Sequence, residues 1–232
     1  MNAPQLPSAL LLDLDGTLID SEAMHAEGII QFLRGLGYAL DAAETRVFVI
    51  GRAWQEIYAH LEVKERFGLD LPSLQRGAIA AKEAMFAAGA KMPVLPGAVE
   101  LALLASSLGV PMAIVSGSCR AEIEHALASL GIGRHLEFYL GAEDYAFGKP
   151  APDGYLAAAA RLKVAPRRCL VVEDSSAGIA SGIAAGMRVL ATAAANPPAG
   201  APGHQDQRAA HRVVRGLEGL SAADLIAMME GA

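Results

Sequence analysis

The chain has 232 residues, of which 53% are apolar, so it can form one large globular domain or a core with a smaller insertion. Its 19 basic and 25 acidic residues give a formal net charge of −6. This balance excludes the broad basic surface that binding to nucleic acid or to anionic lipid would require. The expected partner is therefore a small molecule, with no nucleic acid and no membrane involved.

The sequence shows no clear export signal and no motif of paired cysteines. The segment 1–5 carries no basic residue, and the longest apolar stretch, 101–115, is interrupted by serine, glycine and proline. Cys119 and Cys169 stand fifty positions apart without a CxxC pair, which favours reduced thiols over a disulfide or a zinc site. We expect a soluble, cytoplasmic protein, and any metal should have oxygen ligands.

The first predicted strand, Leu10–Leu14, belongs to an apolar run that ends in two carboxylates, Asp13 and Asp15. Residues i and i+2 face the same side of a strand, so Asp13 and Asp15 are expected to project together from its end. Two carboxylates this close resist joint ionisation, so one of them must hold a proton or a cation must lie between them. An ordinary turn would account for Asp15-Gly16. It leaves Asp13 unexplained, and the pair therefore indicates chemistry.

The next segment has a different pattern, with successive helices such as 23–36 and 74–88 and no convincing strand. It is predicted to be a helical domain inserted after the first strand. Two prolines and a glycine within 92–97 make a stiff connector back to the main domain. The predicted boundaries are 1–20 and 92–232 for the core and 21–91 for the cap.

From Val94 onward, strand-like runs alternate with helical stretches, which is typical of βα units on a parallel sheet. The predicted fold class is α/β, a Rossmann-like three-layer parallel-sheet core with an inserted α-helical cap domain. A proline- and glycine-rich loop is expected at 196–203, and a helix capped by Ser221 with Asp224 in its first turn. The predicted strands are 112–115, 138–140, 169–172, 189–193 and 213–214, and the predicted helices of this part are 97–108, 120–130, 154–162 and 177–185.

Polar side chains follow several of these strands, where open parallel sheets bind ligands. Ser116-Gly117-Ser118 ends one strand and begins a helix, which makes a hydroxyl and backbone amides available to an anion. Glu173-Asp174 ends another strand, and Lys149 lies in a stiff loop before a helix. Each segment alone would pass as a helix cap or a solvated lysine. Together with the first acid pair, they indicate one site at this edge of the sheet.

These segments resemble the haloacid dehalogenase-like hydrolases over essentially the whole chain. Asp13-Leu14-Asp15-Gly16-Thr17-Leu18 looks like the first motif of that family, Ser116 the second, Lys149 the third, and Glu173-Asp174 the fourth. The strings 148–153 and 173–179 are similar to the branch that has a helical cap after the first motif. That branch contains sugar-phosphate phosphatases and β-phosphoglucomutases.

The resemblance implies roles for the catalytic residues. Asp13 would attack phosphorus and form an aspartyl-phosphate, while Asp15 would protonate the leaving oxygen and later deprotonate the attacking water. Ser116, with Gly117 and Ser118, would hold the phosphoryl oxygens. Lys149 would offset negative charge on both the phosphate and the nucleophile.

The resemblance also implies the cofactor Mg²⁺, a hard cation with oxygen ligands. Asp13, Asp174, Glu173 and the backbone carbonyl of Asp15 would surround it, and Glu173 could act through a water. The second aspartate of the first motif favours phosphate esters, because dehalogenases and phosphonate-cleaving members of the family lack it.

The leading hypothesis is a Mg²⁺-dependent phosphatase that acts on a small phosphorylated metabolite, a sugar or sugar-acid phosphate. A β-phosphoglucomutase-like phosphomutase is the alternative, and a non-catalytic phospho-ligand sensor is a third hypothesis of a different class. Intact Asp13, Asp15 and Lys149 argue against the sensor, because a binding module does not need the nucleophile. The expected oligomeric state is a monomer.

Substrate-binding candidates in the cap are His25, Arg52 and Lys82. His25 falls where the mutases have a hinge histidine, and Lys82 could match their cap lysine. Arg52 could meet a hydroxyl or a second phosphate, but it stands two places earlier than the arginine of the corresponding mutase turn, which counts against mutase activity. The structural alternatives are a helix-surface histidine, a solvated arginine and a Trp54 that packs in the cap core. Cys119 lies near a predicted helix N-terminus, which motivates the hypothesis of oxidant-sensitive activity, with a passive thiol as the alternative.

Overall fold

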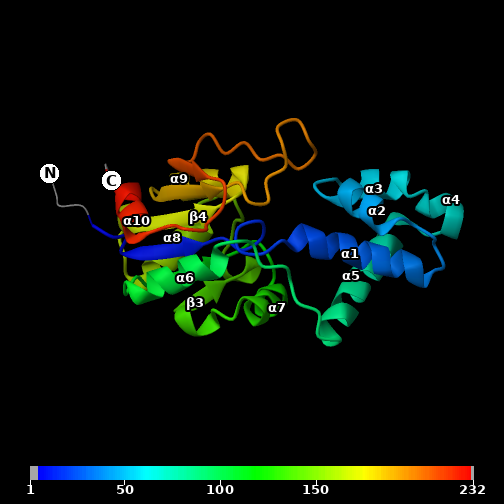
Figure 1. Ribbon diagram of the computed structural model, residues 1–232, viewed down its shortest axis with the longest axis horizontal. Helices are drawn as coiled ribbons and strands as arrows, with labels where there is room; N and C mark the ends of the chain where they lie inside the picture. The colour runs from blue at the N-terminus through cyan, green and yellow to red at the C-terminus, as the bar shows by residue number, and fades with distance from the viewer. Residues whose placement is uncertain (1–4, 231–232) are drawn as a thin grey trace. The chain divides into compact units, whose positions relative to one another are not determined.

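The computed structural model describes residues 5–230 and divides them into two compact units (Figure 1). The first comprises residues 5–20, 94–196 and 205–230, and the second comprises 21–93 and 197–204. The predicted core also contained residues 92–93 and 197–204, which group with the second unit instead. Within that unit, backbone meets backbone so closely that a Cβ on Gly51 would lie 2.6 Å from the Cα of Gly203.

The first unit is built on a sheet of six strands, all parallel, in the order β3-β2-β1-β4-β5-β6. The first predicted strand is therefore central, as expected. The strands are β1 (Ala9–Leu12), β2 (Met112–Val115), β3 (Phe138–Leu140), β4 (Cys169–Glu173), β5 (Arg188–Thr192) and β6 (Arg212–Val214).

Two strand ends differ from the prediction and matter for the site. The Asp13 N–H still donates to the carbonyl of Val172 (2.9 Å), but the chain then turns, and three later amides point back to the carbonyl of Leu14. Because β1 ends at Leu12, neither Asp13 nor Asp15 lies within the strand, and the strand alternation used to predict their shared direction does not apply to them. By contrast, β4 is one residue longer than predicted and ends at Glu173, which is fully buried.

Helices flank both faces of the sheet, which confirms the predicted three-layer α/β class (Figure 1). One face packs Leu11, Val115 and Val171 against α8 and α9 in a single apolar cluster. Side chains that alternate with these, such as Leu12, point to the other face. The helices of this unit are α6 (Ala98–Ser107), α7 (Arg120–Leu130), α8 (Asp153–Leu162), α9 (Ser176–Ala184) and α10 (Ala222–Met228), with 3₁₀ turns at Gly133–His135, Ala142–Asp144 and Pro166–Arg168.

The second unit is helical throughout its described secondary structure. Its buried cluster joins α1 and α5, which cross so closely that a Cβ on Gly28 would lie 2.7 Å from the carbonyl oxygen of Ala78. Asp41 and Asp70 cap helices by accepting backbone N–H bonds. Its helices are α1 (Ser21–Gly35), α2 (Ala42–Val49), α3 (Trp54–His60), α4 (Val63–Phe67) and α5 (Leu71–Ala87).

The terminal helix α10 begins as predicted. Ser221 Oγ accepts from the Asp224 N–H (3.3 Å), and the Asp224 carboxylate accepts in return from the Ser221 N–H (3.0 Å). This reciprocal arrangement is a capping box. Among residues 5–230, no helix is both long and apolar enough to cross a bilayer.

Candidate active site

The polar residues that follow β1, β2 and β4 meet at the carboxyl edge of the sheet. β1 lies between β2 and β4, and the strand order reverses there, so the loops after the three strands converge. Asp13, Ser116 and Glu173 are all buried at this edge. Buried polar groups of this kind need partners.

Lys149 joins the first and fourth motifs. Its ammonium forms an ion pair with Asp13 and another with Glu173, whose Oε1 lies 2.6 Å from Nζ. The Lys149 side chain is only 14% exposed and the two carboxylates are 8% and 0% exposed, so water screens these charges weakly. Lys149 precedes a cis peptide bond to Pro150. The structure thus brings together three residues that the sequence placed in three separate motifs.

The Glu173 carboxylate accepts bonds on both oxygens. Oε2 accepts from the backbone N–H of Asp174 and from the N–H and hydroxyl of Ser175, each at 3.0 Å. Oε1 accepts from the Tyr155 hydroxyl at 2.9 Å as well as from Lys149. Gly178 leaves the space that this side chain occupies, because a Cβ there would lie 1.6 Å from Oε1. Glu173 is therefore held in one orientation.

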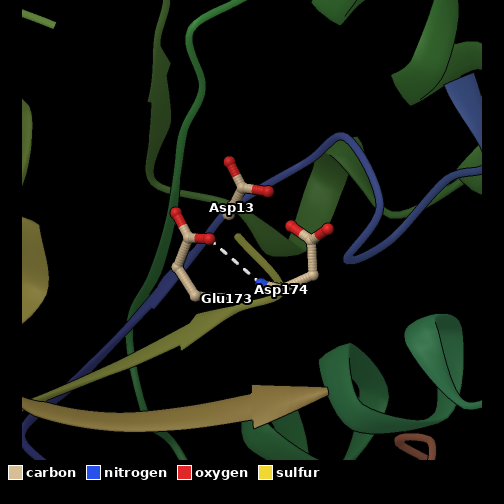
Figure 2. A group of neighbouring side chains, drawn as sticks. All are labelled: Asp13, Glu173 and Asp174. Atoms are coloured by element: carbon tan, nitrogen blue, oxygen red, sulfur yellow. Dashed lines mark hydrogen bonds between the residues drawn. The ribbon is translucent and has the colours of Figure 1, made fainter. Parts of the chain in front are cut away.

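Three carboxylates form a group that could hold a metal ion (Figure 2). One oxygen each from Asp13, Glu173 and Asp174 lies within 4.8 Å of the others, at the ends of β1 and β4. Thr17 donates to Asp174 Oδ1 (3.3 Å), and Gly16, whose φ is +78°, leaves room for Oδ2, which a Cβ would approach to 2.3 Å.

The electrostatics of this group fit a cation. Burial raises the pKa of Asp13 well above its ordinary value, and Glu173 adds to the rise, while Lys149 opposes it. Burial, followed by repulsion from Glu173, raises the pKa of Asp174 to about 7. Burial acts to lower the pKa of Lys149, but the adjacent Asp13, Tyr155 and Glu173 outweigh it and raise that pKa. Two of the three carboxylates pair with the one ammonium, and a hard divalent cation with oxygen ligands would balance the excess negative charge.

Asp15 is held on the side of the second motif. Its Oδ2 accepts from the hydroxyls of Ser116 (3.1 Å) and Ser118 (2.8 Å), and the Ser118 N–H in turn donates to Ser116 Oγ (3.0 Å). Gly117 between them is exposed, and no atom lies within 4 Å of a Cβ built on it. Asp13 and Asp15 therefore have different surroundings, one beside an ammonium and the other beside two hydroxyls.

The remaining candidates lie in the second unit. The ring of His25 meets the edge of Trp54, with centroids 4.7 Å apart. Arg52 forms an ion pair with Glu56 (3.3 Å) and lies over the ring of Phe48 (4.3 Å). Lys82 lies on α5 near Gly28, where the two long helices cross. Their role in substrate binding stays a prediction.

The two cysteines differ in environment. Cys119 is exposed at the start of α7, and its Sγ lies 3.7 Å from a Glu122 carboxylate oxygen. Cys169 is buried in β4, and burial raises the pKa of its thiol to about 11. Both are free thiols, as predicted, and the oxidant sensitivity of Cys119 stays a hypothesis.

Sequence reasoning missed several residues that shape the site. Tyr155 was hidden in an alanine-rich helix, and Thr17 was treated only as part of a motif. Tyr145 donates to the carbonyl of Ser116 (2.6 Å), and buried Gln207 donates to the carbonyls of Asp174 and Thr192, each at 2.7 Å. The pattern Pro152-Asp153-Gly154-Tyr155, an aromatic residue directly after the lysine loop, was the available signal for Tyr155.

A model of haloacid dehalogenase-like hydrolases matches residues 7–186, which contain every motif described above. The chain belongs to this family. It is 34% identical over 189 residues to the bifunctional riboflavin kinase/FMN phosphatase of Arabidopsis thaliana, covering 81% of this chain but only 48% of that protein. It is 33% identical over 214 residues to hexitol phosphatase A of Escherichia coli, covering 83% and 84% of the two chains.

Among solved structures, a provisionally assigned β-phosphoglucomutase from Thermotoga maritima superposes with a TM-score of 0.70 at 20% identity. It covers 95% of this chain and 97% of that one. At this identity the match supports the fold alone. The comparisons confirm the predicted enzyme class, a phosphatase of the haloacid dehalogenase-like family.

Proposed function

We propose that the protein is a Mg²⁺-dependent phosphatase of small phosphorylated metabolites, sugar or sugar-acid phosphates, acting through an aspartyl-phosphate. The observation that carries the proposal is the buried ion pair of Asp13 with Lys149, next to two further carboxylates that could share a cation. Burial and Glu173 raise the pKa of Asp13 while Lys149 lowers it, and a bound cation would further favour the ionised carboxylate that attacks phosphorus.

In the first step, an oxygen of Asp13 forms a bond to phosphorus while the bond to the ester oxygen breaks. Asp15 supplies the proton that the leaving oxygen needs. In the second step, Asp15 takes a proton from water as the water oxygen bonds to phosphorus, and the bond between Asp13 and phosphorus breaks. Inorganic phosphate leaves, and both aspartates return to their starting state.

Two hydroxyls hold Asp15 beside the proposed phosphate-binding loop. Both donors to Asp15 Oδ2, Ser116 and Ser118, come from the loop that would also hold the phosphoryl oxygens. Gly117 leaves the backbone of that loop open. Lys149 stabilises the negative charge that develops near Asp13 without having to move.

Mg²⁺, when bound, would neutralise negative charge on the phosphoryl group and help to orient it toward the nucleophile. Asp13 and Asp174 are the proposed carboxylate ligands, with the Asp15 carbonyl, and Glu173 lies within reach directly or through a water.

The first experiment measures Mg²⁺-dependent phosphate release from p-nitrophenyl phosphate and from a panel of sugar and sugar-acid phosphates. Wild-type protein is expected to release phosphate, Asp13→Asn to be inactive, and Asp206→Asn to match wild type. Asp206 is the control because it is an exposed carboxylate that forms an ion pair with Arg208, two residues away. Absence of turnover with the whole panel would contradict the proposal and favour the phospho-ligand sensor.

Phosphomutase activity is the second candidate, because His25 and Lys82 stand where the family resemblance places residues of the mutases. The substrate that separates the two is β-glucose 1-phosphate with a trace of the bisphosphate. Free phosphate supports the phosphatase, and glucose 6-phosphate supports the mutase.

A further inference from the structure

Tyr155 is a fully buried tyrosine whose hydroxyl forms a hydrogen bond in the site. It lies on α8, and its hydroxyl donates to Glu173 Oε1 (2.9 Å). The other donor to that oxygen is Lys149, and Lys149 Nζ lies 5.3 Å from the centre of the Tyr155 ring. Tyr155 thus contacts Glu173 and Lys149, the two groups beside the proposed nucleophile.

Two carboxylates, those of Asp13 and Glu173, compete for the ammonium of Lys149. A Glu173 carboxylate with few other donors would attract the ammonium strongly and draw it away from Asp13. The Tyr155 hydroxyl donates one of the hydrogen bonds that Glu173 Oε1 accepts, and three other donors bond to Glu173 Oε2. The ammonium of Lys149 also lies over the ring of Tyr155, which is a favourable cation–π contact.

We propose that Tyr155 is a positioning residue, which sets how Lys149 is shared between Glu173 and Asp13 through its hydrogen bond to Glu173 Oε1. The inference rests on the proposed function of the same site. It adds a residue that acts through Glu173 and Lys149 and touches neither the substrate nor the metal.

The direct test is Tyr155→Phe, which keeps the ring and removes only the hydroxyl. The matched control is Tyr139→Phe, because the Tyr139 hydroxyl also donates to a glutamate oxygen (Glu124 Oε1, 2.8 Å), but at an exposed site. Loss of a hydrogen bond to a buried charged group is expected to lower kcat about fivefold to tenfold in Tyr155→Phe, with KM unchanged within about twofold. Tyr139→Phe should match wild type in both parameters.

A double-mutant cycle with Glu173→Gln separates positioning from a structural role. If Tyr155 acts through Glu173, adding Tyr155→Phe to Glu173→Gln lowers kcat by much less than it does in wild type. Equal losses in both backgrounds would overturn the inference. So would a wild-type kcat in Tyr155→Phe, or a loss that disappears once kcat is measured far below a lowered melting temperature.

A binding measurement tests the inference without turnover. Orthovanadate with Mg²⁺ mimics the charge of phosphoryl transfer, so calorimetry should show about fivefold weaker binding to Tyr155→Phe than to wild type or Tyr139→Phe. Equal affinities would overturn the inference. If wild type binds vanadate but releases no phosphate from any ester, the proposed function fails while the binding result still decides the role of Tyr155. If wild type does not bind vanadate either, both proposals fail.

Discussion

Gly178 on α9 and Glu173 on β4 lie so close that a Cβ at residue 178 would be 1.6 Å from Glu173 Oε1. Glycine at this position is what allows the carboxylate to reach Tyr155 and Lys149. The same carboxylate lies within the group of three acids that could hold a metal. A helix residue with no catalytic group of its own therefore controls the geometry of the site.

Gly178→Ala is expected to displace Glu173 and to lower kcat/KM about 100-fold, since misplacement by about 1 Å can cost that much. The measurement is steady-state phosphate release. Gly133→Ala is the control, because no atom lies within 4 Å of a Cβ at Gly133. Unchanged activity in Gly178→Ala would show that the orientation of Glu173 does not matter.

Mg²⁺ should stabilise the fold, and Asp174 should be needed for that effect. Saturating Mg²⁺, at about 100 times its dissociation constant, contributes roughly 2.7 kcal/mol, or a rise of roughly 5–10 °C in melting temperature. Chelation with EDTA should reverse the rise. Asp174→Asn should lose it, while Asp206→Asn should keep it.

Without Mg²⁺, Asp174→Asn should melt at a higher temperature than wild type, because it removes a partly buried charge repelled by Glu173. A wild-type response to Mg²⁺ in Asp174→Asn would place the cation elsewhere.

His211 gives the fold a pH dependence that is separate from the site. Its Nδ1 accepts from the Val189 N–H (3.0 Å), and burial, with Arg188 nearby, lowers its pKa from 6.5. The neutral ring is favoured in the folded state, so its contribution is present above about pH 6.5 and is lost as pH falls through the lowered pKa.

His211→Asn should cost about 1 kcal/mol at pH 7.5 and reduce the loss of stability between pH 7 and pH 5, as measured by urea unfolding. His125→Asn, at an exposed position on α7, should keep the wild-type pH dependence. A wild-type pH slope in His211→Asn would contradict the assignment.

The capping box of α10 should contribute to stability alone. Ser221→Ala removes the hydroxyl that accepts from the Asp224 N–H and is expected to lower the free energy of unfolding by about 1 kcal/mol, with kcat unchanged. Ser129→Ala is the matched control, because Ser129 lies inside α7, where its hydroxyl donates to the carbonyl of His125 and caps no helix N-terminus. An equal loss in both variants would indicate that the cap has no special role.

Most of the fold could be predicted because periodicity and strand-end chemistry agree. The runs 112–115 and 138–140 have the bounds of β2 and β3, and helix 120–130 has those of α7. The end of β1 could not be predicted, because the turn depends on three amides that converge on one carbonyl, that of Leu14. Local sequence does not encode such a convergence.

For the site, residue types were predictable and their contacts were not. The motif residues Asp13, Lys149 and Glu173 stood out as charges after strands, and the structure brings them together. The contact of Tyr155 could not be predicted, because the Glu173 oxygen to which its hydroxyl donates is eighteen positions away on another element. Residues 197–204 group with the helical unit, where the backbones of Gly51 and Gly203 approach each other closely. No sequence pattern predicts this approach.

The most direct measurement of the central claim is chemical trapping of the phosphorylated enzyme. Wild-type protein is mixed with Mg²⁺ and substrate, quenched during turnover, and reduced with borohydride, which converts an acyl phosphate to an alcohol. Peptide mass spectrometry should find homoserine at position 13, and none in Asp13→Asn or in protein without substrate. Phosphate release without any reduction product at position 13, or a product at another carboxylate, would contradict the assignment of Asp13 as the nucleophile.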